Sequence, residues 1–271
     1  NLMNNILYRS RYDELSAHVA AGLNAQTVFS DYPPEDLVSC DTFAVIDLIL
    51  IKWLVERLVA EDTGAKLDEL TIPQLCEKRS KMHFGEKAGS RYQMLSSAYQ
   101  MIQAGNYHCP DTFKDILRQY QETDSGLDYE YRRFYSAYDQ IEDTTAFEPL
   151  RDLVENIYTN EYLETLLPKW NSAMQEPDAF TQLPLQRDFY ARNVKNAKER
   201  TVVIISDAMR YEVGKELFRR MQDDPKCSAK LEVQLSVLPS YTRLGMAALL
   251  PHTELTMTDD FKVLVDGLPC D

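Results

Sequence analysis

The hydrophobic pattern of this 271-residue chain changes at Arg200, and that change limits its fold more than any other sequence feature. Before it, apolar residues recur at spacings of three and four, which place them on one face of a helix. After it, residues 201–206 (TVVIIS) form a continuous β-branched run, typical of a strand buried on both faces of a parallel sheet. We therefore expect a helical part followed by an α/β part.

Composition divides the chain at the same place. The net charge is −14, of which residues 1–199 carry −12 and residues 200–271 only −2. We predict a helical domain over residues 1–199, as a bundle or an irregular array, and an incomplete α/β domain over residues 200–271. The acidic total argues against a chain that coats nucleic acid or anionic membrane by bulk charge, although a local basic groove remains compatible with it.

Several boundaries can be placed within the helical part. A helix start is predicted at Thr71, because its capping hydroxyl is followed within two residues by Pro73. Helix starts are also predicted at Asp111 and Asn160, because apolar residues in helical spacing follow each of them. Pro168 should end or kink its helix. The most hydrophobic stretch, residues 43–59, is interrupted by charged residues. A membrane span needs ~20 mostly apolar residues, so this stretch predicts a buried core helix and no membrane association.

Other features of the chain favour a reduced compartment. The five cysteines are an odd number and include no C-x-x-C pair, so neither a disulfide framework nor a zinc ribbon is expected. No secretory signal opens the chain, and a cytoplasmic location is the default. The first residue is not Met, as in an excised piece of a longer protein. Tyrosines at 129, 131, 135 and 138 are either a binding stripe or half-buried packing, and we favour packing.

The part that follows Arg200 alternates between strands and helices. A β-α-β-α-β order predicts right-handed crossovers and a parallel sheet. The expected strands are residues 201–206, 231–238 and 261–265, and the expected helices are residues 209–221 and 242–250.

Two polar residues follow the first two of these strands. Asp207 comes directly after the first, and Thr242 starts the helix after the second. Ligands in open α/β sheets bind outside the carboxyl ends of the strands, so a short distance between these two residues is expected. A carboxylate can hold a divalent metal, a metal activates a neighbouring hydroxyl, and a helix N-terminus attracts phosphate. On the pattern alone, we favour the interpretation that both residues are helix N-caps without catalysis.

Two blocks carry a family resemblance. Residues 202–212 (VVIISDAMRYE) and 238–251 (LPSYTRLGMAALLP) resemble, in that order, motifs of the PglZ domain, most closely the A-type of bacterial BREX phage-exclusion systems. PglZ domains belong to the alkaline-phosphatase superfamily of metallo-phosphohydrolases. The resemblance covers about the last 72 residues and implies an alkaline-phosphatase-like α/β domain with a parallel sheet.

The resemblance also assigns roles. Asp207 matches the first metal-ligand aspartate, and Thr242 matches the nucleophile, which also contacts a metal. The implied mechanism is in-line attack by Thr242 on phosphorus, a phospho-threonine intermediate and its hydrolysis by water. The implied cofactors are two divalent metals, Zn²⁺ first, with Mn²⁺ or Mg²⁺ as alternatives. Arg210 and Arg243 either touch phosphate or form surface ion pairs, and we favour ion pairs.

The superfamily needs further Asp and His ligands downstream of the nucleophile. Only His252 follows Thr242, and a helix-end role is the more economical interpretation of it. His18, His83 and His108 show no paired metal spacing. The chain therefore looks truncated within its catalytic domain, and we expect it to be inactive as given. Because its sheet would have an apolar unpaired edge, we expect the C-terminal part to pack against the helical part, to dimerise, or to be partly disordered near Asp271.

Three functions remain open. The first is a metal-dependent phosphohydrolase of an antiphage system, acting on a phosphomonoester or on a phosphodiester such as nucleic acid or a nucleotide. The second is a non-catalytic scaffold that docks other subunits of a phage-exclusion complex through the helical part. The third is a mutase-like phosphotransferase, because the superfamily includes phosphosugar mutases.

Overall fold

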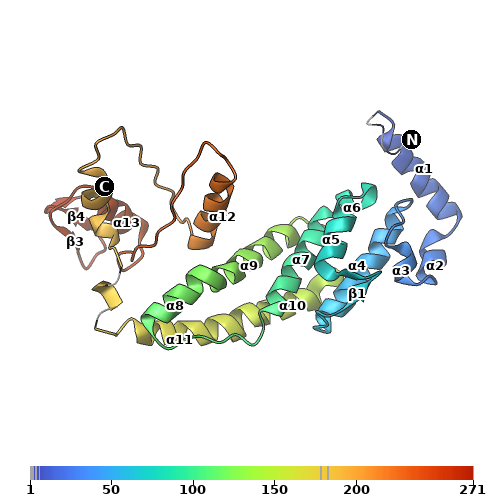
Figure 1. Ribbon diagram of the computed structural model, residues 1–271, viewed down its shortest axis with the longest axis horizontal. Coiled ribbons are helices and arrows are strands. Elements are labelled where there is room, and N and C mark those ends of the chain that lie inside the picture. Colours follow the sequence, from blue (N-terminus) through green and yellow to red (C-terminus); the bar gives the residue numbers. More distant parts are fainter. Residues whose placement is uncertain (1–2, 4, 6, 178, 182, 271) are drawn as a thin grey trace. The chain divides into compact units, whose positions relative to one another are not determined.

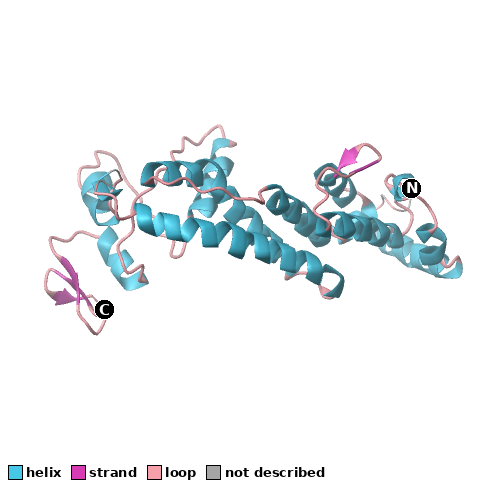
Figure 2. Ribbon diagram, turned by 90° about the horizontal axis from the view of Figure 1, so that it is seen from below, coloured by secondary structure: helices cyan, strands magenta, loops and turns pink. Residues whose placement is uncertain are grey.

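The computed structural model describes residues 3, 5, 7–177, 179–181 and 183–270. Helices account for most of this described part, and strands are few and short (Figure 2). The chain divides into two compact units. The first comprises Asn1–Cys109 and Gly126–Leu167, and the second comprises Pro110–Ser125 and Pro168–Asp271.

The first unit is built from helices around one hydrophobic core (Figure 1). Its central helix, α4, is the predicted core helix within residues 43–59, and Leu50, Leu54 and Leu58 on it are fully buried. Helices α5, α7 and α10 pack around it or around one another. The elements are α1 (Arg9–Gly22), α2 (Ala25–Ser30), α3 (Pro34–Leu37), α4 (Ala44–Val59), β1 (Lys66–Leu67), β2 (Leu70–Thr71), α5 (Ile72–Ser80), α6 (His83–Lys87), α7 (Gly89–Gln103), most of α9 (Ser125–Tyr138), η2 (Thr145–Phe147), α10 (Glu148–Asn156), η3 (Ile157–Leu163) and the start of α11 (Glu164–Ala173).

The predicted helix starts had different outcomes. Thr71 is the N-cap of α5 and forms a capping box with Gln74, as its sequence pattern predicts. At the second site the cap is Thr112, whose hydroxyl accepts the Asp115 N–H, rather than Asp111. The start at Asn160 is wrong, because this residue lies inside the π-helical segment η3, between two α-helices that it joins.

Pro168 lies inside α11, so the helix does not end there. The missing N–H of proline removes one bond of the helix ladder, but neighbouring side chains hold the helix beyond it. Trp170 stacks on Phe113 with ring centroids 5.2 Å apart. Lys169 pairs with Asp111 at 2.7 Å. These contacts come from residues distant in sequence, which is why the proline alone did not reveal them.

The second unit combines short helices with a small sheet. The two helices predicted after Arg200 are confirmed as α12 and α13, with ends shifted by one or two residues. The elements are α8 (Phe113–Gln119), η1 (Tyr120–Asp124), the rest of α11, η4 (Ala179–Thr181), η5 (Gln186–Asp188), η6 (Tyr190–Val194), α12 (Tyr211–Gln222), α13 (Thr242–Leu249), β3 (Leu255–Met257), β4 (Val263–Val265) and β5 (Leu268–Pro269).

The expected parallel sheet is not present among the described residues. Residues 201–206 form no strand there, and residues 231–238 contribute one parallel bridge, between Leu235 and Leu185. A strand exists only through repeated hydrogen bonds to a neighbouring strand, and the described part of the chain supplies no paired strand for residues 201–206 and a single bridge for residues 231–238. Ile204 is accordingly 88% exposed.

The third expected strand does form, as β4, but within an antiparallel sheet of order β3-β4-β5. Local turn chemistry explains the direction. Asp266 and Gly267 both have positive φ, 51° and 81°, and Val265 pairs with Leu268 across them. A two-residue Asp-Gly loop of this kind reverses the chain into a hairpin, so β4 and β5 are antiparallel.

The division into domains at residues 199 and 200 remains a prediction. The compact units place residues 110–125 and 168–199 with the C-terminal part. Asp271, near which disorder was expected, lies outside the described residues. No helix within the described ranges is long and apolar enough to cross a membrane.

Candidate functional site

Asp207 lies in an exposed turn that leads towards α12. Its Oδ1 accepts the N–H of Ala208 at 2.9 Å, and Ala208 adopts a left-handed conformation with φ of 55°. A non-glycine residue with positive φ is uncommon and marks a tight turn. Asp207 therefore lies before α12, which begins at Tyr211.

Thr242 is the first residue of α13 and is exposed. The loop before it contains a cis peptide bond between Leu238 and Pro239, and Tyr241 N–H donates to the Pro239 carbonyl at 2.7 Å. The N-cap position belongs to Tyr241, in an extended conformation. As at any helix start, the first backbone N–H groups of α13 have no partner within the helix, and this end of a helix attracts anions.

Neither candidate residue is a helix N-cap. The N-cap of α12 is Arg210 and that of α13 is Tyr241, and neither helix has a side-chain capping bond. The capping interpretation of Asp207 and Thr242 therefore does not describe this structure. No hydrogen bond joins Asp207 to Thr242 among the described residues, so their expected approach at a sheet edge stays a prediction.

A metal centre needs more ligands than these two residues supply. Zinc sites use at least three protein ligands, and magnesium and calcium sites use six or more oxygens with water included. The described residues contain no group of three or more His, Cys, Asp or Glu placed to hold a metal ion. The residues present therefore do not fit a complete metal site, and we derive no reaction step through a metal.

The arginines beside the candidate residues are exposed. Arg210 precedes α12 and Arg243 is the second residue of α13. Neither forms a salt bridge within the described part of the chain, in contrast to the ion-pair interpretation of the sequence. Two guanidinium groups therefore place positive charge close in sequence to Asp207 and Thr242.

The histidines have local or structural contacts. The His252 ring nitrogen Nδ1 lies 2.8 Å from the carbonyl of Leu250, the C-cap of α13, which agrees with a helix-end role. His83 is buried in the first unit, where its Nδ1 accepts from Arg9 Nε at 3.0 Å and its Nε2 lies 2.5 Å from Asp13 Oδ1. The contacts of His83 join it to Arg9 and Asp13 of α1 in the first unit.

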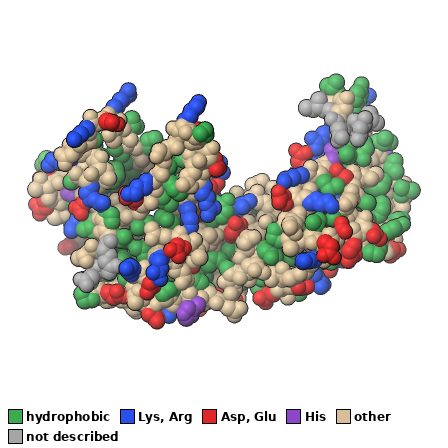
Figure 3. Space-filling model, in the orientation of Figure 1, with side chains coloured by type: hydrophobic (Ala, Val, Ile, Leu, Met, Phe, Trp, Pro, Cys, Tyr) green, Lys and Arg blue, Asp and Glu red, His purple; other side chains and the backbone are tan. Residues whose placement is uncertain are grey.

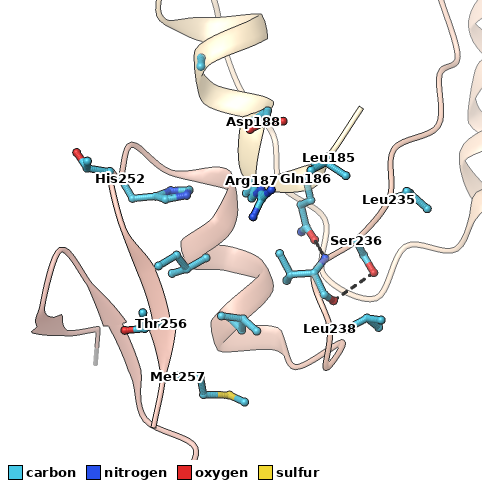
Figure 4. Close-up of a pocket in the computed structure, with 15 residues that line it drawn as sticks. Leu185, Gln186, Arg187, Asp188, Leu235, Ser236, Leu238, His252, Thr256 and Met257 are labelled. Carbon is cyan, nitrogen blue, oxygen red and sulfur yellow. Dashed lines mark hydrogen bonds between the residues drawn. The ribbon is translucent and has the colours of Figure 1, made fainter. Parts of the chain in front are cut away.

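A cavity of about 790 Å³ adjoins α13 and was not expected from the sequence (Figure 4). It is lined by residues 185–188, Ala191, residues 235–238, Leu244 of α13, His252, Thr253 and residues 255–257. Gln186 lies at the centre of these contacts and donates its Nε2–H to the carbonyl of Gly245 at 3.1 Å. No sequence motif marks Gln186, because its partners lie more than 45 residues away.

Comparisons with known proteins show which proteins this chain resembles. The model of the BREX system PglZ alkaline phosphatase-like domain matches residues 188–271. The chain is 35% identical over 266 residues to "Alkaline phosphatase-like protein PglZ" of Bacillus cereus (strain H3081.97), covering 94% of this chain and 31% of that protein. It is 31% identical over 282 residues to "Alkaline phosphatase-like protein BrxZ" of Escherichia coli O9:H4 (strain HS), covering 96% and 32%. The chain thus spans about a third of the length of these relatives. No solved structure matches it.

Proposed function

Residues 188–271 belong to the PglZ family of BREX alkaline phosphatase-like domains, and on this premise we propose that the protein is a phosphohydrolase of a phage-defence system. In this proposal Thr242 is the nucleophile and Asp207 is one metal ligand. The other ligands would come from the two thirds of the relatives' length that this chain does not span. Zn²⁺ is the proposed metal, with Mn²⁺ and Mg²⁺ as alternatives.

The observation that carries the proposal is the position of Thr242 at the start of α13. A hydroxyl there lies among backbone N–H groups without a helical partner, which together bind phosphate oxygens. In the proposed reaction Thr242 Oγ1 attacks phosphorus while the bond to the leaving-group oxygen breaks. Water then cleaves the phospho-threonine and releases phosphate.

Local charge supports an anionic substrate. Residues 187–243 contain twelve Lys and Arg against eight Asp and Glu, although the whole chain has a net charge of −14. Lys and Arg side chains accordingly project from the C-terminal unit at the left of Figure 3. The excess of positive side chains in this segment would attract phosphate esters, including nucleic acid and nucleotides.

The proposal is tested by hydrolysis of 4-nitrophenyl phosphate and bis(4-nitrophenyl) phosphate with Zn²⁺, Mn²⁺ or Mg²⁺, using the full-length gene product. We expect Thr242→Ala and Asp207→Ala each to lower kcat by about 1,000-fold or more, since each removes a group that acts on the transition state. Thr27→Ala and Asp259→Asn, which change an exposed threonine and an exposed aspartate elsewhere, should leave turnover unchanged.

Turnover that is indifferent to Thr242→Ala would exclude this nucleophile. Absence of turnover with every metal would favour the second candidate function, a scaffold that docks other subunits of a defence complex. The first unit offers one observation for it, since α1 and α2 leave apolar side chains exposed: Leu15 at 55%, Val19 at 42% and Val28 at 44%. The two functions can coexist in one protein.

A further inference from the structure

Gln186 joins three segments that are distant in sequence. Its backbone N–H donates to the Leu235 carbonyl at 2.8 Å, beside the return bond from Leu235 N–H to the Pro184 carbonyl at 2.9 Å. These two bonds form the parallel bridge between the segment before η5 and the segment before the Thr242 loop. The Gln186 side chain is thereby directed towards the loop (Figure 4).

The side-chain amide of Gln186 then contacts both ends of that loop. Its Oε1 accepts the backbone N–H of Val237 at 3.1 Å, before the cis Leu238–Pro239 bond. Its Nε2 donates to the Gly245 carbonyl at 3.1 Å, inside the first turn of α13. The amide packs against the helix, since a Cβ at position 245 would be 3.4 Å from Nε2, an ordinary contact distance.

We propose that Gln186 is a positioning residue for the nucleophile, because its amide holds the two ends of the loop that presents Thr242. The inference rests on the proposed function for its consequence in catalysis. Gln186 itself does not touch the phosphorus or the leaving group. It acts by holding Val237 and Gly245 at one separation, and Thr242 is three residues before Gly245.

The chemistry of the contact requires an amide of this length. A glutamate would keep the acceptor for Val237 N–H but would turn a carboxylate towards the Gly245 carbonyl, where a donor is needed. A methionine has a similar length and no hydrogen-bonding amide, so it removes both bonds. Nucleophilic catalysis depends steeply on placement, and an error of about 1 Å can cost 100-fold in rate.

The test compares Gln186→Met and Gln186→Glu with the wild type in the full-length gene product. With bis(4-nitrophenyl) phosphate and Zn²⁺ or Mn²⁺, we expect Gln186→Met to lower kcat about 10- to 100-fold with KM nearly unchanged. The kcat of Gln186→Glu should lie between those of Gln186→Met and the wild type, since the glutamate keeps one of the two hydrogen bonds. Gln222→Met, at an exposed position at the end of α12, is the matched control and should behave as the wild type. Equal kcat for Gln186→Met and the wild type would overturn the inference.

A second measurement does not depend on hydrolysis. In the 271-residue chain, hydrogen–deuterium exchange of peptides covering residues 236–246 should accelerate about 10-fold in Gln186→Met, while exchange in α4 stays unchanged. If the wild type shows no turnover, the proposed function fails and this exchange result alone decides whether Gln186 holds the loop. Unchanged exchange in residues 236–246 would overturn the inference. Faster exchange throughout the chain would do the same, since it shows general unfolding.

Discussion

At the scale of single residues, Glu155 accepts hydrogen bonds from two tyrosines of the helical part. The hydroxyls of Tyr135 and Tyr131 both donate to Glu155 Oε2, at 2.6 and 2.9 Å. Tyr131 also stacks on Tyr158 with ring centroids 3.7 Å apart. Burial, followed by the Glu155 carboxylate, raises the pKa of Tyr131 to about 12. These tyrosines are therefore packing residues that share one acceptor, as the sequence favoured, rather than a stripe open to a ligand.

This network makes stability depend on pH. The hydroxyl of Tyr135, and after it that of Tyr131, lowers the pKa of Glu155 in the folded protein. The ionised carboxylate therefore stabilises the fold above the ordinary Glu pKa of about 4.3. This contribution is lost as the pH falls through the lowered pKa.

We expect Glu155→Gln to lower the free energy of unfolding near pH 7 by about 1 kcal/mol or less, since the group is close to solvent. The difference in the free energy of unfolding between Glu155→Gln and the wild type should shrink below about pH 4, as the carboxylate becomes protonated. Urea unfolding between pH 7 and pH 3 measures it, with Glu142→Gln, at an exposed residue, as the control. A difference that is the same at every pH would show that the carboxylate charge is not responsible.

At the scale of elements, α12 is the helix that follows Asp207, and one lysine ties it to η1. Lys215 Nζ donates to the Gln121 carbonyl at 2.5 Å and to Ser125 Oγ at 3.1 Å. Burial, followed by the charge of Arg219, lowers the pKa of Lys215. Burial of the charged Lys215 side chain therefore costs free energy, and its hydrogen bonds to the Gln121 carbonyl and Ser125 Oγ offset that cost.

Replacing this lysine should loosen α12. We expect Lys215→Met to weaken the local stability of α12 by about 1.5 to 3 kcal/mol, the usual range for hydrogen bonds to a charged group. Hydrogen–deuterium exchange over residues 209–227 measures this. Arg220→Met is the matched control, since the Arg220 side chain is 75% exposed and pairs along the helix with Glu216. Equal exchange in the two variants would show that the η1 contact does not hold α12.

At the scale of the whole molecule, the chain contains Asp207 and Thr242, two of the groups that the proposed phosphohydrolase would need. In that proposal they would supply two oxygen ligands, and the described residues contain no group of three or more His, Cys, Asp or Glu placed to hold a metal ion. The chain also spans about a third of its relatives' length. The apolar side chains of Val202 and Ile204 are 72% and 88% exposed. Association of the chain through the apolar run at residues 201–206 therefore stays an expectation.

We therefore expect the 271-residue chain to bind Zn²⁺ at least about 100-fold more weakly than the full-length gene product, because missing ligands cost that order of affinity or more. The chain should also show no hydrolysis of bis(4-nitrophenyl) phosphate. Isothermal titration with Zn²⁺ and the same hydrolysis assay measure both. Turnover by the chain at the level of the full-length gene product would refute this expectation.

Much of the local structure follows from residues close together in sequence. Helical spacing predicts α4 as a buried helix, Thr71 with Gln74 caps α5, and the pattern after Tyr241 starts α13 at Thr242. The two sequence blocks around Asp207 and Thr242 also identify the family of residues 188–271. These predictions succeed because caps, turns and amphipathic faces depend on neighbours within about one or two helical turns.

Other features were decided only by the tertiary structure. The direction of β4 depends on which strands pair with it, and the apolar runs at 201–206 and 231–238 cannot form strands without such partners. The contacts of Gln186 with Val237 and Gly245 join residues 51 and 59 positions apart. Sequence patterns determined which segments are helical and where the candidate chemistry lies. Tertiary structure decided how the Thr242 loop is held, because hydrogen bonds between distant segments exist only after the chain has folded.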